Sequence, residues 1–104
     1  MAFADNLKQL SAIDHLAALE LIDEAGNVTA LIENKPGKAG SLAVYAALFA
    51  KHGRIHVAAA EEGLLIFAEH TEDARVHPGN HPNIDRLLDV IATGQGFTCR
   101  LIPS

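Results

Sequence analysis

Cysteine and tryptophan are almost absent from this sequence, and each absence limits what it can do. Cys99 is the only cysteine, so no intramolecular disulfide and no cysteine-rich metal cluster can form. Tryptophan does not occur, and the aromatic residues are four Phe and one Tyr. The core must therefore be built mainly from Leu, Ile, Val and Ala. Because 104 residues is an ordinary length for one domain, we expect a single domain over residues 1–104.

Clusters of basic residues and long apolar runs are also missing. The formal net charge is −5 with neutral histidines, and the lysines and arginines are scattered, which argues against a nucleic-acid partner. No apolar run approaches the roughly 20 residues that a membrane helix needs, so no membrane partner is expected. The N-terminal segment MAFADNLKQL lacks the basic and apolar regions of a signal peptide. We therefore expect a cytoplasmic protein.

The first third of the chain predicts a short helix and a β-hairpin. Apolar residues at helical spacing indicate a helix near Ala4–Leu10. Residues 16–33 alternate in two halves, and the turn between them contains Gly26, which is suited to a left-handed conformation. A hairpin alone is unstable in water, so it needs a third strand or covering helices.

Three further helices are predicted after the hairpin. The first runs from Ser41, as its N-terminal residue, to Gly53. The second covers residues 57–75, where Gly63 is expected to permit close helix packing. The third begins at Pro82 and ends at Gly94, and it carries the cleanest apolar stripe: Ile84, Leu87, Leu88 and Ile91.

The C-terminal segment Phe97–Ile102 alternates and favours a strand. This order of elements predicts an α+β domain. We expect a three-stranded, mostly antiparallel sheet, formed by the hairpin and the C-terminal strand. It packs against three helices, with the short N-terminal helix in addition. The pattern does not indicate which hairpin strand the C-terminal strand joins.

Three segments carry a family resemblance: NKPGKAGSLAVY from residue 34, AEHTEDAR from residue 68 and HPNIDRL from residue 81. Together they resemble a bacterial family known as domain of unknown function 2322, and the similarity extends through nearly the whole chain. The resemblance implies a bacterial single-domain protein of about this length. It implies no established activity, ligand or catalytic residue.

The glycine-rich loop before the helix at Ser41 is a candidate anion-binding site. A strand, a loop and a helix N-terminus in succession can direct free N–H groups at an anion, and lysines add charge. The spacing differs from that of the P-loop motif. The preferred interpretation is structural, because these residues also serve to end the strand and begin the helix. The candidate ligand-binding residues are Lys35, Gly37, Lys38, Gly40 and Ser41.

A group of histidines is a second candidate, as a metal site. His70, His77 and His81 lie close in sequence, with carboxylates beside them, and imidazole and carboxylate are common ligands of zinc. His77 and His81 are four residues apart, the spacing that places two metal ligands on one helix face in metalloproteases. However, Pro78, Gly79 and Pro82 prevent such a shared helix face here. Solvated histidines in and beside a loop are the preferred interpretation.

Nucleophilic catalysis is the weakest candidate. Cys99 shares a predicted strand face with Phe97 and Leu101, which indicates a position in the apolar core. Ser41 is expected to cap a helix. No paired carboxylates and no nucleophile motif stand out, so we predict no catalytic residue and no cofactor, and we favour a non-enzymatic role.

A self-association surface is the fourth candidate. Helices on one face of a three-stranded sheet leave its other face to be covered, and four apolar residues could form a patch there: Ala18, Ile22, Leu31 and Ile102. Coverage by the N-terminal helix is an equal alternative. We therefore predict a non-enzymatic, homo-oligomeric interaction or binding module. The alternatives are binding of a small phosphate-type anion at Lys35–Ser41 and binding of a metal by the histidines.

Overall fold

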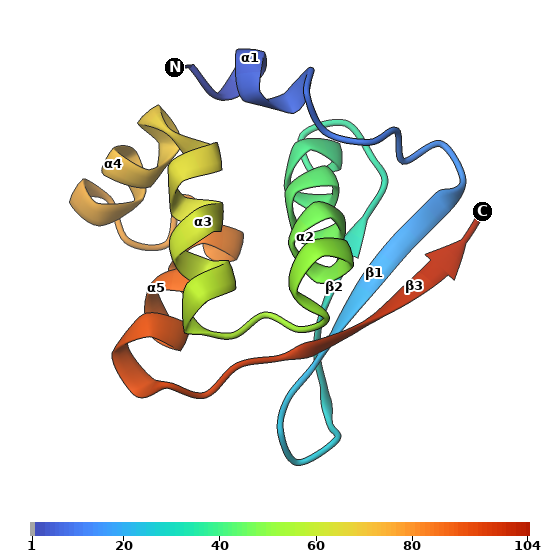
Figure 1. The fold of residues 1–104 in the computed structure, drawn as a ribbon. Helices are drawn as coiled ribbons and strands as arrows, with labels where there is room; N and C mark the ends of the chain where they lie inside the picture. Colours follow the sequence, from blue (N-terminus) through green and yellow to red (C-terminus); the bar gives the residue numbers. More distant parts are fainter. Residues whose placement is uncertain (1) are drawn as a thin grey trace.

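The computed structural model describes residues 2–104 and has an α+β fold, as predicted (Figure 1). A hairpin is followed by a series of helices and a final strand. In chain order the elements are α1 (Phe3–Leu7), β1 (Leu16–Ile22), β2 (Val28–Glu33), α2 (Ala39–His52), α3 (Val57–Phe67), α4 (Glu69–Val76), α5 (Pro82–Thr93) and β3 (Thr98–Pro103). In the described part of the chain, no helix is both long and apolar enough to pass through a membrane.

The sheet is antiparallel throughout, with the strand order β2-β1-β3. The central strand β1 places Leu19 opposite Ile32 on one side and Leu101 on the other. Leu19 and Leu21 are fully buried, and Cys99, opposite Leu21, is 8% exposed. The predicted core position of Cys99 is therefore confirmed.

Local hydrogen bonds explain the hairpin turn. The side chain of Asp23 accepts bonds from the backbone N–H groups of Ala25 and Asn27, at 3.0 and 2.9 Å. Gly26 has a φ of 90°, a conformation that glycine adopts without steric cost, as the sequence predicted.

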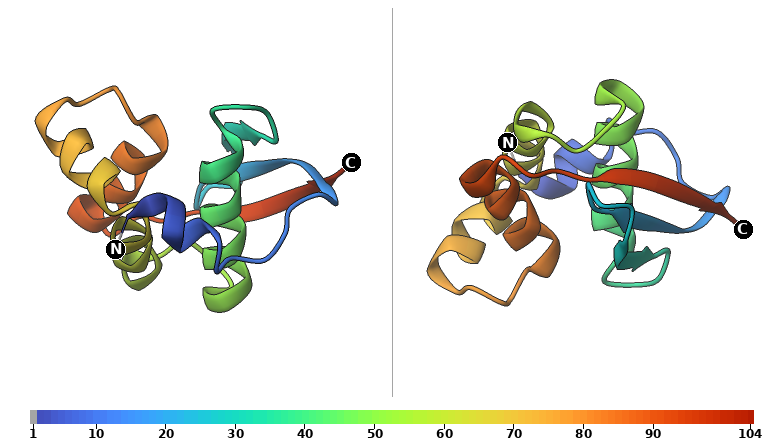
Figure 2. Two further views of the ribbon diagram at one scale, coloured as in Figure 1. Left: turned by 90° about the horizontal axis from the view of Figure 1, so that it is seen from above. Right: turned by 90° about the horizontal axis from the view of Figure 1, so that it is seen from below.

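The helices form two layers on one side of the sheet (Figure 2). Helix α2 contacts all three strands, and α3 packs on α2 and α5 behind it. Gly63 allows this close approach, since a Cβ atom there would lie 2.7 Å from Leu87 Cδ1 and 2.9 Å from Leu48 Cδ1. The predicted role of Gly63 in helix packing is thus confirmed.

The helix expected over residues 57–75 is divided in two. Ala68 ends α3 with φ 51° and ψ −116°, values that an L-residue rarely adopts. After this break, Thr71 donates from its backbone to Ala68 O at 3.0 Å and from Oγ1 to Leu64 O at 2.7 Å. The break is not visible in the sequence, because alanine is the best helix former.

The predicted start of α2 at Ser41 was wrong by two residues. The helix begins at Ala39, and its N-cap is Lys38, whose side chain makes no capping bond. The carbonyl of Lys35 accepts from the N–H groups of Lys38 and Ala39, which winds the chain into the helix early. Gly53 caps the C-terminus with a left-handed conformation, as expected.

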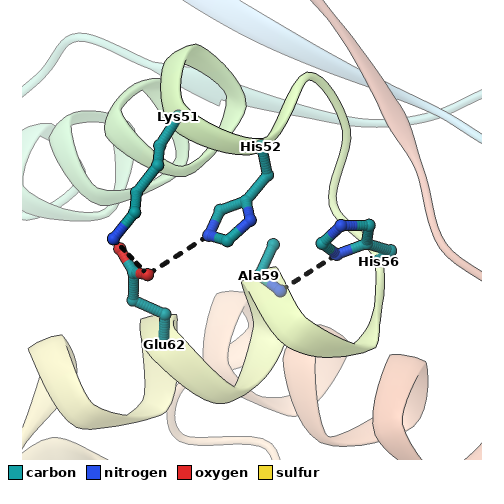
Figure 3. Close-up of polar contacts among 5 residues, drawn as sticks. All are labelled: Lys51, His52, His56, Ala59 and Glu62. Carbon is teal, nitrogen blue, oxygen red and sulfur yellow. Dashed lines mark hydrogen bonds and ion pairs between the residues drawn. The ribbon is translucent and has the colours of Figure 1, made fainter.

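Histidines organise the junction between α2 and α3 (Figure 3). Glu62 Oε1 lies 2.8 Å from Lys51 Nζ and 3.2 Å from His52 Nε2, so the carboxylate joins the end of α2 to α3. His56 caps α3, because its Nδ1 accepts a bond from Ala59 N.

Candidate functional site

A cleft of about 660 Å³ brings together residues that the sequence analysis assigned to two separate sites. Its lining comes from α1, β2, the loop into α2, the end of α3, α4 and the start of α5. Four of the predicted loop residues line it: Gly37, Lys38, Gly40 and Ser41. Two of the predicted histidines, His70 and His81, line it as well.

Lys35 faces Glu33 and does not line the cleft. Its Nζ lies 3.0 Å from Glu33 Oε2, and Lys38 Nζ lies 3.8 Å from Glu33 Oε1. The hydrogen bond and charge of Lys35, with a smaller contribution from Lys38, hold the pKa of Glu33 below its usual range. Glu33 is thus the ion-pair partner of both lysines, which gives them a structural role in this loop. Lys38 is the more loosely held lysine, and it is the one beside the cleft.

The three predicted histidines do not form one group. The rings of His70 and His81 lie 5.3 Å apart, and His81 Nε2 lies 2.7 Å from Asp73 Oδ2. His77 is exposed and lies 4.0 Å from Asp73 Oδ1 through its Nε2. Within residues 2–104, no three His, Cys, Asp or Glu side chains are arranged to hold a metal ion. Metal binding at these histidines stays a prediction.

The N-termini of α2 and α5 both open on the cleft. Neither helix has a side-chain cap, and Pro82 begins α5 as the sequence predicted. The N–H groups of Gly40 and Ser41 have no hydrogen-bond partner within residues 2–104. Such groups carry partial positive charge at the start of a helix. The hydroxyl of Tyr45, in the second turn of α2, donates to the carbonyl of Asn83 at the start of α5, which joins the two helices.

Arg86 is a charged residue of the cleft that was not among the predicted site residues. Its Nη1 donates to Asn83 Oδ1 at 2.7 Å, and it forms no ion pair with any carboxylate of the described residues. Asn83 and Arg86 are three positions apart, so both lie on one face of α5 near its N-terminus. That spacing could have indicated a polar binding face on α5, but the polar face of any amphipathic helix has the same spacing.

Cationic side chains line the cleft directly, and carboxylates lie behind them. Lys38 and Arg86 line it together with two histidines, and among the described residues no aspartate or glutamate does. The chain as a whole has a formal net charge of −5. Carboxylates nevertheless contact three of the lining residues: Glu33 lies 3.8 Å from Lys38 Nζ, Asp73 lies 2.7 Å from His81 Nε2, and Glu69 accepts from Phe3 N.

The outer face of the sheet is a second candidate surface. The four predicted patch residues lie on the face opposite Leu19: Ala18 pairs with Ile102, Leu31 pairs with Glu20, which was not predicted there, and Ile22 lies beside them on β1. Leu31 is 55% exposed. The α1 helix packs on α2 and α3, on the other side of the sheet (Figure 2), so the predicted covering by this helix was wrong.

An ion pair crosses the middle of this outer face. Arg100 Nη2 lies 2.6 Å from Glu20 Oε1, and the two residues are directly opposite on β3 and β1. The face also carries Glu33, opposite Ala18, and Thr98, opposite Ile22, so polar and apolar side chains are mixed on it.

The family model described as an uncharacterised protein conserved in bacteria (DUF2322) matches residues 3–101. No curated protein and no solved structure matches the chain. The assignment of a function therefore depends on the geometry described above.

Proposed function

The chain belongs to DUF2322, an uncharacterised protein family conserved in bacteria, and from the geometry of its cleft we propose that it is a binding module for a small anion. One observation carries the proposal: two cations and two histidines line the cleft, and no carboxylate of the described residues does. Lys38 immediately precedes α2 and Arg86 lies in α5, so the positive charge comes from two separate elements.

Two helix N-termini add to this charge. The free N–H groups of Gly40 and Ser41 can donate to an oxyanion, and the dipoles of α2 and α5 favour negative charge at the same place. Arg86 is fixed by Asn83 and needs no carboxylate to be displaced before it binds. Phosphate-type groups fit this set of donors, because Arg can bind two of their oxygens at once.

Thermal unfolding in increasing phosphate or sulfate tests the proposal. An anion at about 100 times its dissociation constant should raise the free energy of unfolding by about 2.7 kcal/mol. Arg86→Gln should abolish most of this gain. Lys8→Gln is the matched control, because Lys8 is also a cation without an ion pair in residues 2–104 but lies outside the cleft. No stabilisation, or equal stabilisation of both variants, would refute the proposal.

We propose binding and not catalysis as the role because the candidate nucleophiles lack activation. Burial raises the pKa of the Cys99 thiol to about 12, so the thiolate that would attack a substrate is scarce. Ser41 lies inside the first turn of α2 and makes no hydrogen bond to a histidine.

Self-association through the outer sheet face is the second candidate function. Helix α2 lies on the opposite side of the sheet, Leu31 on this face is 55% exposed, and the central pair, Glu20 and Arg100, is self-complementary. In a two-fold dimer each acid can face the base of the other copy, which specifies a second copy of this chain as the occupant.

Light scattering across a concentration series tests this candidate. The mass should rise towards that of a dimer, and Ile102→Lys should keep the protein monomeric by placing a charge on the outer face. Leu65→Lys is the control, since Leu65 is 78% exposed on α3, away from the sheet. A mass that stays monomeric at all concentrations, or an equal effect of both variants, would contradict self-association at this face.

A further inference from the structure

The proposed anion-binding cleft also has an aromatic wall. The rings of Phe3 and Phe67 stack, with centroids 5.2 Å apart and planes at 24°. His70 meets Phe3 edge-on, with centroids 5.1 Å apart and planes at 84°. Phe67 is 3% exposed, whereas Phe3 is partly exposed, so Phe3 presents this wall to the cleft.

The aromatic wall and the anion-binding groups are adjacent. A Cβ atom at Gly40 would lie 3.2 Å from Phe3 Cζ and 3.5 Å from Leu7 Cδ1. The first turn of α2, with its free N–H groups, is therefore in van der Waals contact with the side chains of α1. A single ligand can reach the positive and the apolar part together.

Contacts with α3 and α4 hold this wall in place. The N–H of Phe3 donates to Glu69 Oε1 at 2.8 Å, and Asn6 Nδ2 donates to Ile66 O at 2.9 Å. Because the wall is already ordered before a ligand binds, binding does not pay the entropic cost of ordering these side chains. Apolar contact with the wall therefore contributes more of its free energy to affinity.

The size of the cleft exceeds what an inorganic anion can fill. Its 660 Å³ corresponds to roughly 20 water molecules at about 30 Å³ each, whereas phosphate has only five non-hydrogen atoms. Concave sites of about 300–1,000 Å³ are the usual size for organic ligands.

We infer that the ligand is a phosphate monoester that carries a ring-sized apolar group. This inference rests on the proposed anion site and specifies what occupies the rest of the cleft. The phosphate lies by Arg86 and the start of α2, and the apolar group lies on Phe3. Because each buried CH₂ adds about 0.8 kcal/mol, or roughly fourfold in affinity, a ring should tighten binding at least tenfold over inorganic phosphate.

Calorimetric titration of the full chain with three probes tests the inference: inorganic phosphate, phenyl phosphate and the uncharged benzyl alcohol. Phenyl phosphate should bind at least tenfold more tightly than either of the others. Phe3→Leu keeps an apolar side chain but removes the ring, and it should reduce the difference between the two phosphates at least threefold. Phe49→Leu is the matched control, a partly buried phenylalanine outside the cleft.

Each outcome has a defined meaning. Equal affinities for the two phosphates would overturn this inference and leave the anion site intact. Absence of binding by both phosphates would overturn the anion site as well. Benzyl alcohol binding as tightly as phenyl phosphate would show that charge has no role, which also refutes the anion site. An equal effect of Phe3→Leu and Phe49→Leu would place the apolar group elsewhere and refute the inference.

Discussion

Nδ1 of His56 accepts a hydrogen bond from the backbone N–H of Ala59 at 3.0 Å, which makes an imidazole the N-cap of α3 (Figure 3). His56→Ala should lower the free energy of unfolding by about 1 kcal/mol, because a helix N–H then loses its partner. His56→Asn should retain most of the stability, since its side-chain oxygen can accept the same bond. Urea unfolding followed by circular dichroism measures the difference. Equal losses in the two variants would show that the cap contributes nothing.

Gly96 should tolerate no side chain. A Cβ atom there would lie 2.1 Å from Ile55 O, which accepts from Phe97 N in one of the two backbone hydrogen bonds between Ile55 and Phe97. Gly96→Ala should therefore cost roughly 3 kcal/mol or more, because the bridge must separate to make room.

Gly63→Ala is the matched comparison for this substitution. Its Cβ would meet only the ends of the Leu87 and Leu48 side chains, which can rotate, and alanine gains about 1 kcal/mol in helix propensity over glycine. Its net cost should be clearly smaller than that of Gly96→Ala. Chemical denaturation ranks the two, and the reverse order would contradict the clash at Ile55.

Ala68→Gly should stabilise the protein. The positive φ of Ala68 costs an L-residue about 1–3 kcal/mol, and glycine removes most of this strain. Glycine also loses more conformational entropy on folding than alanine, which costs about 0.5–1 kcal/mol. We expect a net gain of about 1 kcal/mol in thermal unfolding. Ala68→Val should act in the opposite direction. A stabilising valine would mean that the break between α3 and α4 is absent.

Acid should destabilise the fold partly through Glu62. Its hydrogen bond from Lys51, followed by that from His52, holds the pKa of Glu62 below the usual value of 4.5. The folded state therefore binds this proton more weakly than the unfolded state. The resulting stability is present above about pH 4.5 and is lost as the pH falls through the lowered pKa.

Urea unfolding between about pH 7 and pH 3 measures this loss. Glu62→Gln should have a flatter dependence in the acid range, because it has no proton to bind there. Glu61→Gln is the control, an exposed neighbour without an ion pair in the described residues. Identical pH profiles for Glu62→Gln and the parent protein would contradict the role of Glu62.

The sequence was sufficient to predict the elements of the sheet but not its order. Alternation identified all three strands, and Gly26 located the turn. Residues Leu16–Ile22 are apolar on both faces, however, so the pattern could not show that β1 and not β2 is the central strand. The break at Ala68 was likewise invisible, because tertiary contacts of Thr71 overrule the helix propensity of alanine.

The candidate site was predicted in pieces. The loop around Lys38 and the histidines around His70 were identified as separate sites, because nothing in a linear pattern indicates that the starts of α2 and α5 line one cleft. The contact between Tyr45 and Asn83 joins them in the fold. Arg86 was missed because its position resembles a solvated helix face until the cleft is seen. The family assignment, by contrast, followed from three segments of the sequence and is confirmed.

The central position of β1 also affects how the chain can fold while it is being made. Leu16 at its start pairs with Pro103 at the end of β3, and every helix between α2 and α5 is synthesised between them. Pairs so distant in sequence are slow to form because a large loop must close first. A nascent chain on the ribosome therefore displays one unpaired edge of β1 until β3 emerges. Such an edge can pair with other chains, so a chaperone that covers β1 during translation would protect the newly made protein.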